Sequence, residues 1–466
     1  MCGKYFVEKR KEIQVHGKVI LGFPFGDSEI EQHFCDFYVI EGSHDFVIEV
    51  DDYPIEKACD LVFKNEAIYR DYLFCRDENG EAFTIYDCYI MPMQIPVKQM
   101  KIIWNQCLWG NHIEKFQDEK IISAKYIVQT DKKRYPFHMF VGKNDFKLMD
   151  GKVSISTDWN QENSKFEGVA ISISLKDSLS INEVEKIVLR MLEIFFLQIG
   201  FFPKVEKRTM ITEEQKIFCF MEDFAAYGKT AKSNIKLDHV LYTKKDFDFS
   251  AVCDNWWKLR EKEVVTFNLF SYLTTDSSPV REVPIATCIQ CLEGYFRIHH
   301  SEEMLRFSKS AKNQIRKEVL KALDSSDSLK KVCEDNGIEY ENIRGSFNRM
   351  SGHINEYSLK DILQYAIERC DSTKRLFQYE CETKINEKTS LMDLFIQKAT
   401  GHRNWLSHLT EQTKRFIKDE ISFADDKLRM LFRLTLLYDI GIELTDTSLD
   451  TIIQRINQWY KLNELV

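Results

Sequence analysis

The sequence lacks the long apolar runs and the recurring motifs that define several large classes of protein. Its most apolar stretch, residues 188–202, contains Arg190 and Glu193 and falls short of a membrane span. The first residues show no apolar segment of the kind that secretory signals carry. A P-loop, Rossmann glycines, an H-E-x-x-H zinc motif and a serine-hydrolase elbow are also missing. We therefore expect a cytoplasmic protein that contacts no membrane.

Excess positive charge and a regular cysteine framework are missing as well. The net charge of −9 argues against a protein that coats nucleic acid non-specifically, because such binding depends on neutralising phosphates. The charge still allows a local basic site. The 13 cysteines are odd in number and follow no framework spacing, which fits a reducing cytosol better than a disulfide scaffold. Cys288 and Cys291 stand alone on a predicted helix, so we expect core cysteines and no metal.

The sequence changes character near residue 205. Before it, short runs rich in Val, Ile, Phe and Tyr alternate with Gly, Asp and Asn. This pattern is typical of an antiparallel β-sandwich or barrel-like domain. Residues 181–200 then predict one helix that ends at Gly200. Clear examples of the predicted strands are residues 44–52, 80–91, 120–130 and 168–175.

From about residue 249 the helical period dominates. A long helix begins near Pro284 and continues to residue 307, with the two histidines 299 and 300 on it. Ser358 and Ser390 each stand three residues before an aspartate, as in a capping box, and Gly401 predicts a helix stop. The predicted fold is α+β and multidomain: a β-rich sensor or regulatory domain over 1–205, a connector or final strands over 206–248, and an all-α bundle over 249–466.

One segment of the helical part carries residues suited to chemistry. Residues 403–408 read Arg-Asn-Trp-Leu-Ser-His, or R-N-x-x-x-H. Histidine titrates near neutral pH and can take or give a proton, while arginine stays charged and offers a planar fork to phosphate oxygens. RNA transesterification needs these two functions and no metal. The Arg-to-His spacing alone also arises by chance, as Arg10 and His16 show on a predicted strand.

Helix geometry constrains how Arg403 and His408 can cooperate. Residues five apart on a regular α-helix differ by about 140° and about 7.5 Å of rise, so these two would not share a face. Asn404 and His408, four apart, would share one. We therefore expect Arg403 at the irregular start of a helix, with Asn404 and His408 one turn apart behind it. Asn404 would orient His408 or hydrogen-bond a phosphate.

The segment in its helical context resembles the HEPN superfamily, whose motif is Arg, a polar residue and then His. Together with CLEGYFR (291–297) and LLYDIGI (436–442), behind a β-rich N-terminal part, the chain resembles the ApeA-type anti-phage HEPN proteins. The match is best over residues 285–442. The resemblance implies an abortive-infection endoribonuclease without a cofactor, with Arg403 and His408 as catalytic residues. It also implies that two motifs pair across a homodimer or higher oligomer formed through the HEPN domain.

The resemblance also suggests a substrate, a trigger and further site residues. Family habit points to cellular RNA, transfer RNA among it, and to a phage-derived trigger. An acid at the place of Glu293 lies near the Arg/His pair in related proteins, so Glu293 would orient Arg403 or His408. A structural ion pair is the alternative. A basic segment would guide RNA, or form a solvated helix face instead, through Arg306, Lys309, Lys312, Arg316 and Lys317.

Three alternatives stay open at this point. The HEPN domain could be an inactive scaffold that grips RNA, a nucleotide or a partner protein. The N-terminal domain could be a carbohydrate or peptide binder, with the helices only dimerising. Arg403 and His408 could also be ordinary exposed residues of a bundle helix, with Asn404 as a cap.

Overall fold

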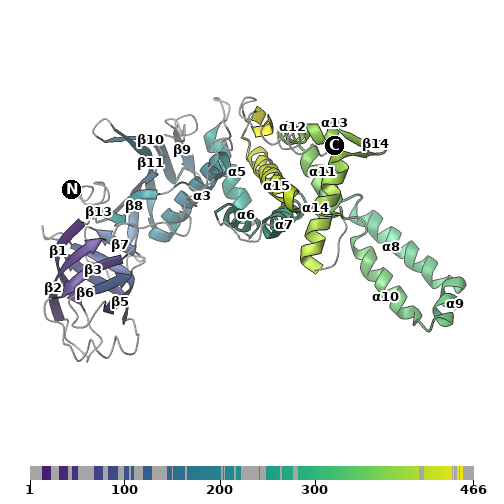
Figure 1. Cartoon of the computed structure of the whole chain (residues 1–466), viewed down its shortest axis with the longest axis horizontal. Coiled ribbons are helices and arrows are strands. Elements are labelled where there is room, and N and C mark those ends of the chain that lie inside the picture. The colour runs from purple at the N-terminus through teal and green to yellow at the C-terminus, as the bar shows by residue number, and fades with distance from the viewer. Residues whose placement is uncertain are drawn as a thin grey trace. The chain divides into compact units, whose positions relative to one another are not determined.

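The computed structural model divides the chain into two compact units. One contains residues 1–242 with 248–254, and the other contains residues 243–247 with 255–466. Figure 1 shows strands in the N-terminal half and helices in the C-terminal part. The structure describes residues 13–21, 31–39, 45–50, 68–76, 82–92, 99–103, 106–109, 119–128, 144–148, 151–162, 165–200, 203, 205–214, 217–221, 241, 248–262, 265–275, 282–408, 414–442, 444, 449–450 and 452–454.

The described strands of the N-terminal unit form one antiparallel sheet. Their order is β4-β1-β2-β3-β6-β5-β7-β13-β12-β8-β11-β10-β9, and β4 also pairs with β5. The first six strands are therefore linked in a closed cycle of pairings. The strands are β1 (Ile13–Leu21), β2 (Glu31–Val39), β3 (Asp45–Val50), β4 (Ile68–Arg76), β5 (Ala82–Pro92), β6 (Gln99–Ile103), β7 (Gln106–Trp109), β8 (Lys120–Val128), β9 (Asn144–Leu148), β10 (Val153–Glu162), β11 (Lys165–Ser180), β12 (Val205–Thr212) and β13 (Ile217–Met221).

The predicted antiparallel sheet is thus confirmed, and its finer packing as a sandwich or barrel stays a prediction. β12 and β13 occupy the start of the region predicted as a connector or final strands. Residues 222–240 of that region lie outside the described part of the chain.

The predicted helix after the strands is α3 (Ile181–Ile199). Ser180 and Glu183 form a capping box at its start, and Gly200 ends it with a φ of 85°, a backbone region that favours glycine. Arg190 and Glu193, which interrupt the apolar stretch, are both buried and bind each other at 2.9 Å. Among the described residues, no helix has the length and apolar character that crossing a bilayer requires.

The helical unit is built around α7 (Glu282–His299), which contacts α6, α11, α14 and α15. Its core side chains, among them Ile289 and Phe296, are fully buried, as are Cys288 and Cys291, so the prediction of core cysteines is confirmed. The other helices are α5 (Phe249–Lys262), α6 (Val265–Thr275), α8 (Lys309–Asp324), α9 (Asp327–Asp335), α10 (Tyr340–Met350), α11 (Leu359–Glu368), α12 (Asp371–Leu376), α13 (Gln378–Glu382), α14 (Leu391–His408) and α15 (Lys418–Asp439).

The prediction that this helix continues to residue 307 is wrong, because α7 ends at His299. The residues that follow leave the helix because they bond to a segment about fifty residues later in the chain. Leu305 pairs with Glu356 in a β-bridge, and the carbonyl of Met304 accepts the N–H of Tyr357 at 3.0 Å. His300 therefore lies on the turn after α7. The capping of α11 by Ser358 and of α14 by Ser390 is confirmed by reciprocal hydrogen bonds with Asp361 and Asp393.

A buried ion pair joins α13 to α15. The ammonium of Lys427 binds the carboxylate of Glu380, and both side chains are fully shielded from solvent. Burial lowers the pKa of Lys427, and Glu380 opposes that shift. The rings of Phe377 and Phe423 lie within 4.5 and 5.4 Å of the ammonium. Because no solvent reaches either group, water cannot take the place of the partner ion if the pair separates. The pair therefore stabilises the contact between α13 and α15.

We expect Glu380→Gln to lower the free energy of unfolding by about 3–5 kcal/mol, because it removes the carboxylate that the buried Lys427 ammonium binds. Urea denaturation of the full chain, followed by circular dichroism, measures the change. Asp371→Asn is the matched control, since its pair with Lys374 at 3.8 Å is solvent-exposed. Equal stability of the Gln variant and the wild type would show that Glu380 is not the partner that keeps Lys427 charged.

Candidate active site

The R-N-x-x-x-H segment forms the C-terminal end of α14. The helix is continuous from Leu391 to His408, so Arg403 lies well inside it. The expectation that Gly401 stops a helix and that Arg403 stands at an irregular start is wrong. Gly401 is buried inside α14, and a Cβ there would overlap the backbone carbonyl of Lys414. Glycine is therefore needed at 401 for a close approach of the chain, which the helical pattern does not reveal.

The guanidinium of Arg403 is held between two partners. Its Nη2 donates to Glu293 Oε2 at 3.4 Å, and its Nη1 donates to Asn404 Oδ1 at 3.2 Å. The side chain is 28% exposed, so it is both oriented and open to solvent. Glu293 comes from α7, more than a hundred residues earlier. The structure thus brings together three of the four predicted catalytic residues: Arg403, Asn404 and Glu293.

Glu293 also binds a second arginine that the sequence analysis left without a role. Arg297, one turn further along α7, donates to Glu293 Oε1 at 3.1 Å. Arg297 also contacts Glu356 at 3.4 Å, and the Glu356 carboxylate lies 2.8 Å from His353 Nδ1, from which it accepts when that nitrogen carries a proton. The four-residue spacing of Glu293 and Arg297 was the signal that could have found this pair. Two guanidiniums therefore flank one carboxylate.

His408 is the last residue of α14 and is exposed. Among the described residues, no hydrogen bond or ion pair holds its ring. Five positions of regular helix separate it from Arg403, which places the two side chains about 140° apart. Within one chain, the imidazole and the guanidinium therefore do not share a face of α14.

His402, beside the motif, is a buried residue that the sequence analysis missed. Its Nε2 lies 3.1 Å from the carbonyl oxygen of Glu282 at the start of α7. A carbonyl only accepts, so Nε2 carries the proton and Nδ1 presents a lone pair. Nδ1 is buried and has no hydrogen-bond partner among the described residues. Burial lowers the pKa of His402, which keeps the ring neutral and packed against Phe416 and Trp405.

A second polar cluster lies on the Tyr295 side of α7. The carboxylate of Asp439 accepts hydrogen bonds from Tyr295 at 2.5 Å and Arg369 at 2.6 Å, and it lies 2.9 Å from His300 Nε2. Burial opposes ionisation, yet these partners outweigh it and lower the pKa of Asp439. Tyr295 belongs to the 291–297 segment and Asp439 to the 436–442 segment. The contact explains why both segments carry a polar residue on an apolar helix.

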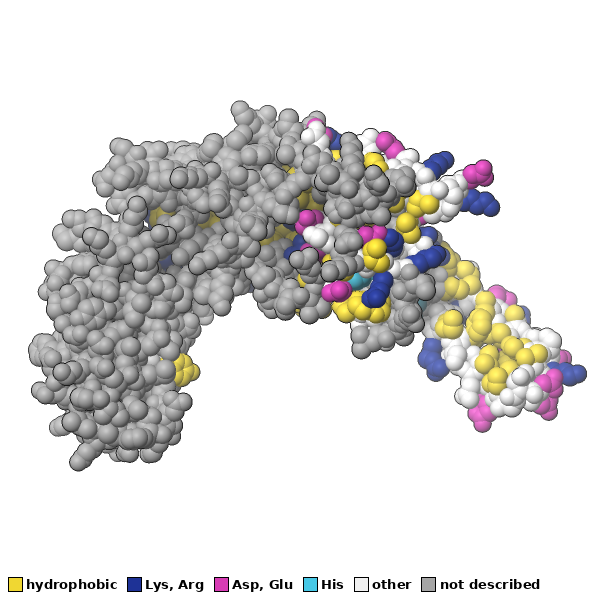
Figure 2. Space-filling view, in the orientation of Figure 1, with side chains coloured by type: hydrophobic (Ala, Val, Ile, Leu, Met, Phe, Trp, Pro, Cys, Tyr) yellow, Lys and Arg dark blue, Asp and Glu magenta, His cyan; other side chains and the backbone are white. Residues whose placement is uncertain are grey.

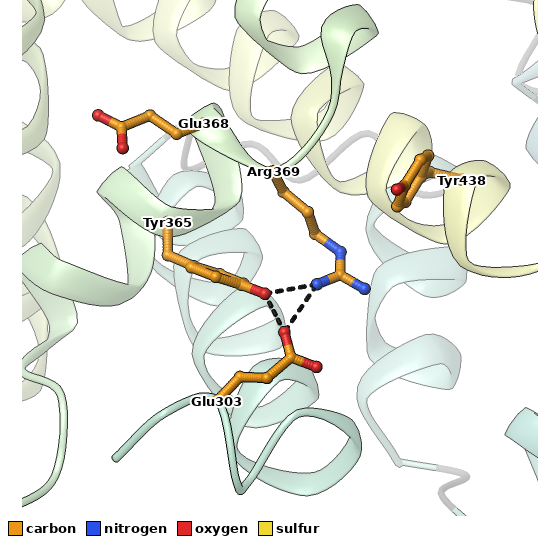
Figure 3. A pocket seen from close by; sticks show the side chains of 5 residues that line it. All are labelled: Glu303, Tyr365, Glu368, Arg369 and Tyr438. Atoms are coloured by element: carbon orange, nitrogen blue, oxygen red, sulfur yellow. Dashed lines mark hydrogen bonds and ion pairs between the residues drawn. The ribbon is translucent and has the colours of Figure 1, made fainter. Parts of the chain in front are cut away.

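A pocket of about 470 Å³ opens beside this cluster (Figure 3). It is lined by Glu303, Tyr365, Glu368, Arg369 and Tyr438. Arg369 donates to Glu303 at 3.1 Å and to the Tyr365 hydroxyl at 2.7 Å, in addition to Asp439. Burial and the hydrogen bond to Glu303 raise the pKa of Tyr365 to about 12. The one cation of the pocket is therefore neutralised by protein carboxylates, and the site does not suit a phosphate.

The five basic residues predicted to guide RNA fall into two groups. Lys309 and Lys317 are exposed on α8, and within the described residues no contact uses their charge. The other three bind the protein itself. Arg306 pairs with Asp361 at 2.5 Å, Lys312 donates to the carbonyl of Gly352 at 3.0 Å, and Arg316 donates to Asn348 Oδ1 at 2.6 Å.

The helical unit places Arg403 and Asn404 of the R-N-x-x-x-H segment beside a carboxylate from another helix. Residues 287–446 match the family model described as Apea-like HEPN, so the resemblance to ApeA-type HEPN proteins is confirmed over these residues. Neither curated proteins nor solved structures give a match to the chain. The domain favours a nuclease-type function in anti-phage defence.

We expect Gly401→Ala to destabilise the helical unit by about 1–3 kcal/mol, because the added methyl forces α14 away from the Lys414 carbonyl. Chemical denaturation of the full chain measures this loss. Gly345→Ala is the control, since a Cβ at that helical glycine meets nothing within 4 Å. A wild-type stability for Gly401→Ala would mean that α14 and the 414 segment do not approach this closely.

His402 should make stability depend on pH. Its pKa is lower in the folded protein than in the unfolded chain, so the unfolded chain binds the proton first. The contribution of His402 is complete above the unfolded pKa of about 6.5 and is lost as the pH falls below it. We expect the unfolding free energy of wild type to fall more steeply than that of His402→Gln below pH 6.5, by at most about 1.4 kcal/mol per pH unit. Parallel curves would contradict a neutral, buried His402.

Proposed function

We propose that this chain is a metal-independent endoribonuclease of anti-phage defence, in which Arg403 and His408 act on the scissile phosphodiester of a cellular RNA. One observation carries the proposal. In an Apea-like HEPN domain, the Arg403 guanidinium is fixed by Glu293 and Asn404 and still reaches solvent. An arginine held in one orientation suits an anion that arrives from solution, because little side-chain entropy remains to be lost.

The charges around Arg403 suit a phosphate. Arg403 and Arg297 share the carboxylate of Glu293, and the second carboxylate, Glu356, contacts Arg297 alone, so the charge of Arg403 is only partly neutralised. Both guanidiniums are about one third exposed. Phosphate oxygens can bind the N–H groups that Glu293 does not use, and guanidinium donors stabilise the charge that builds on phosphorus in the transition state. Glu293 and Asn404 would act as positioning residues.

His408 would move the protons. An imidazole can take the proton of the 2′-hydroxyl or give one to the leaving 5′-oxygen. Attack of the 2′-oxygen on phosphorus breaks the bond to the 5′-oxygen, so the products are a 2′,3′-cyclic phosphate and a 5′-hydroxyl. One reaction needs both proton transfers. A homodimer or higher oligomer that pairs two R-N-x-x-x-H segments would supply the second histidine.

The N-terminal unit would restrain or trigger the nuclease. Its antiparallel sheet suits recognition of a ligand or protein, and a phage-derived trigger fits the defence function. Transfer RNA is the substrate that the resemblance suggests. An inactive HEPN scaffold is the second candidate. It is favoured by the helical separation of Arg403 and His408, which do not meet on one phosphate within a single chain.

We expect His408→Ala and Arg403→Ala each to lower RNA cleavage by about 10²–10⁴-fold, since each removes one of the two chemical functions. Incubation of full-length protein with host transfer RNA, followed by end-group analysis, measures the loss. Wild-type cleavage should persist in EDTA and leave cyclic phosphate ends. Ser407→Ala, the exposed neighbour of His408, is the control and should cut like wild type.

Two outcomes separate the candidates. Variants that cut as fast as wild type would refute the catalytic role of Arg403 and His408. Wild type that binds transfer RNA in a filter assay without cutting it would support the scaffold.

A further inference from the structure

Helices α8, α9 and α10 form a hairpin, here called the arm (residues 308–351), that projects from the rest of the helical unit (Figure 1). α8 and α10 contain no buried residue at all. Yet large apolar side chains gather on the arm, visible as a yellow patch in Figure 2. Two helices that pack mainly on each other bury little apolar surface, so apolar side chains on both helices stay exposed to solvent.

Side-chain hydrogen bonds join α8 to α10 and to Gly352, which follows α10. The two helices are antiparallel, because residues later on α8 bond to residues earlier on α10. On each helix the bonding residues are spaced by multiples of four positions and lie in one row, here called the polar seam, in which Leu320 stands between Arg316 and Asp324. Its contacts are Lys312 with Gly352 at 3.0 Å, Arg316 with Asn348 at 2.6 Å, and Asp324 with Arg344 at 2.7 Å and with Tyr340 at 3.0 Å.

The apolar residues lie beside this seam. Ile315 precedes Arg316 and Phe347 precedes Asn348, so each is rotated about 100° from the seam in the same sense along its helix. In an antiparallel pair, equal rotation turns both rows toward the same side. This side, here called the apolar face, contains Ile315, Val319, Leu323, Ile343, Phe347, Met350 and Ile354, of which Ile315, Phe347, Met350 and Ile354 are 38%, 41%, 71% and 43% exposed.

The opposite side of the arm is basic. Lys317 and Lys321 follow Arg316 by one and five positions, which rotates them about 100° and 140° away from the seam in the other sense. Nucleic acid binding depends on neutralising phosphates, so RNA would meet this basic side. The apolar face is left for a protein surface.

Charge is segregated along the arm as well. The base, residues 306–321, has six basic residues against one acid. The tip, residues 324–341, has six acids against two lysines. If two arms lie antiparallel, each basic base meets the acidic tip of the other arm. The arm is therefore complementary to itself in charge, and a two-fold axis also makes its apolar face complementary to itself.

We propose that the apolar face binds the same face of a second copy of this chain, with the two arms antiparallel in a four-helix layer. Packing four helices buries the apolar rows that two helices leave in solvent. This interface differs from the pairing of R-N-x-x-x-H segments proposed above, because antiparallel arms place the two helical units at opposite ends of the layer. It can be tested independently of RNA cleavage, because none of its residues belongs to the Arg403 site.

Sedimentation velocity on the full chain tests the interface. We expect the wild type to associate at micromolar concentration, and Met350→Asp with Phe347→Asp to weaken the association at least tenfold. Both side chains are already exposed, so the variants should keep wild-type circular dichroism and thermal unfolding. Asn342→Asp is the control, because it adds a negative charge to α10 away from the apolar face and should associate like wild type.

The proposal is overturned if the wild type stays monomeric at tens of micromolar. It is also overturned if the double variant Met350→Asp, Phe347→Asp forms an assembly of the same mass as wild type. In the first case, titration with labelled RNA shows whether the substitutions weaken RNA binding instead, which would assign the face to RNA. Weaker association with unchanged cleavage supports the arm interface whatever the fate of the nuclease proposal. A His408→Ala variant that loses RNA cleavage but forms the wild-type assembly supports the nuclease proposal and leaves the arm interface unaffected.

Discussion

The carboxylate of Glu293 is the group on which the candidate site depends. Its two oxygens bind two arginines from different helices, Arg403 at 3.4 Å and Arg297 at 3.1 Å. Without this charge, the two guanidiniums would repel each other, and each would lose one of the partners that orient it. The carboxylate sits on α7, whose core side chains, among them Ile289 and Phe296, are fully buried. One acid on this core helix therefore holds two guanidiniums that remain open to solvent.

The sequence predicted most of the local structure because local signals specify it. Alternating residues indicated the strands, and Gly200 marked the end of α3 in a conformation that glycine adopts easily. Ser358 and Ser390 marked helix starts through hydrogen bonds only three residues long. Each of these signals is read within a few positions of the chain, so no tertiary information was needed.

The errors arose where distant segments meet. Gly401 looked like a helix stop, but its missing side chain makes room for the Lys414 carbonyl. The end of α7 at His299 depends on contacts with residues 356 and 357. Glu293 and Arg403 could be named from the resemblance, yet their ion pair spans the helical unit. Arg297 was missed although its spacing from Glu293 indicated an i,i+4 pair. The pairing of His408 with Arg403 stays a prediction, because it depends on a second chain.

Glu293 and Tyr295 stand two positions apart on α7, and two residues of helix turn the side chains about 200° from each other. One faces the Arg403 end of α14 and the other faces Asp439, the last residue of α15. Helix α7 thus contacts both the R-N-x-x-x-H end of α14 and the C-terminal end of α15. A shortened version of this protein that stops before residue 439 would leave the buried phenol of Tyr295 without the carboxylate it binds. A form of the domain that keeps this hydrogen bond must therefore extend beyond the R-N-x-x-x-H segment to the end of α15.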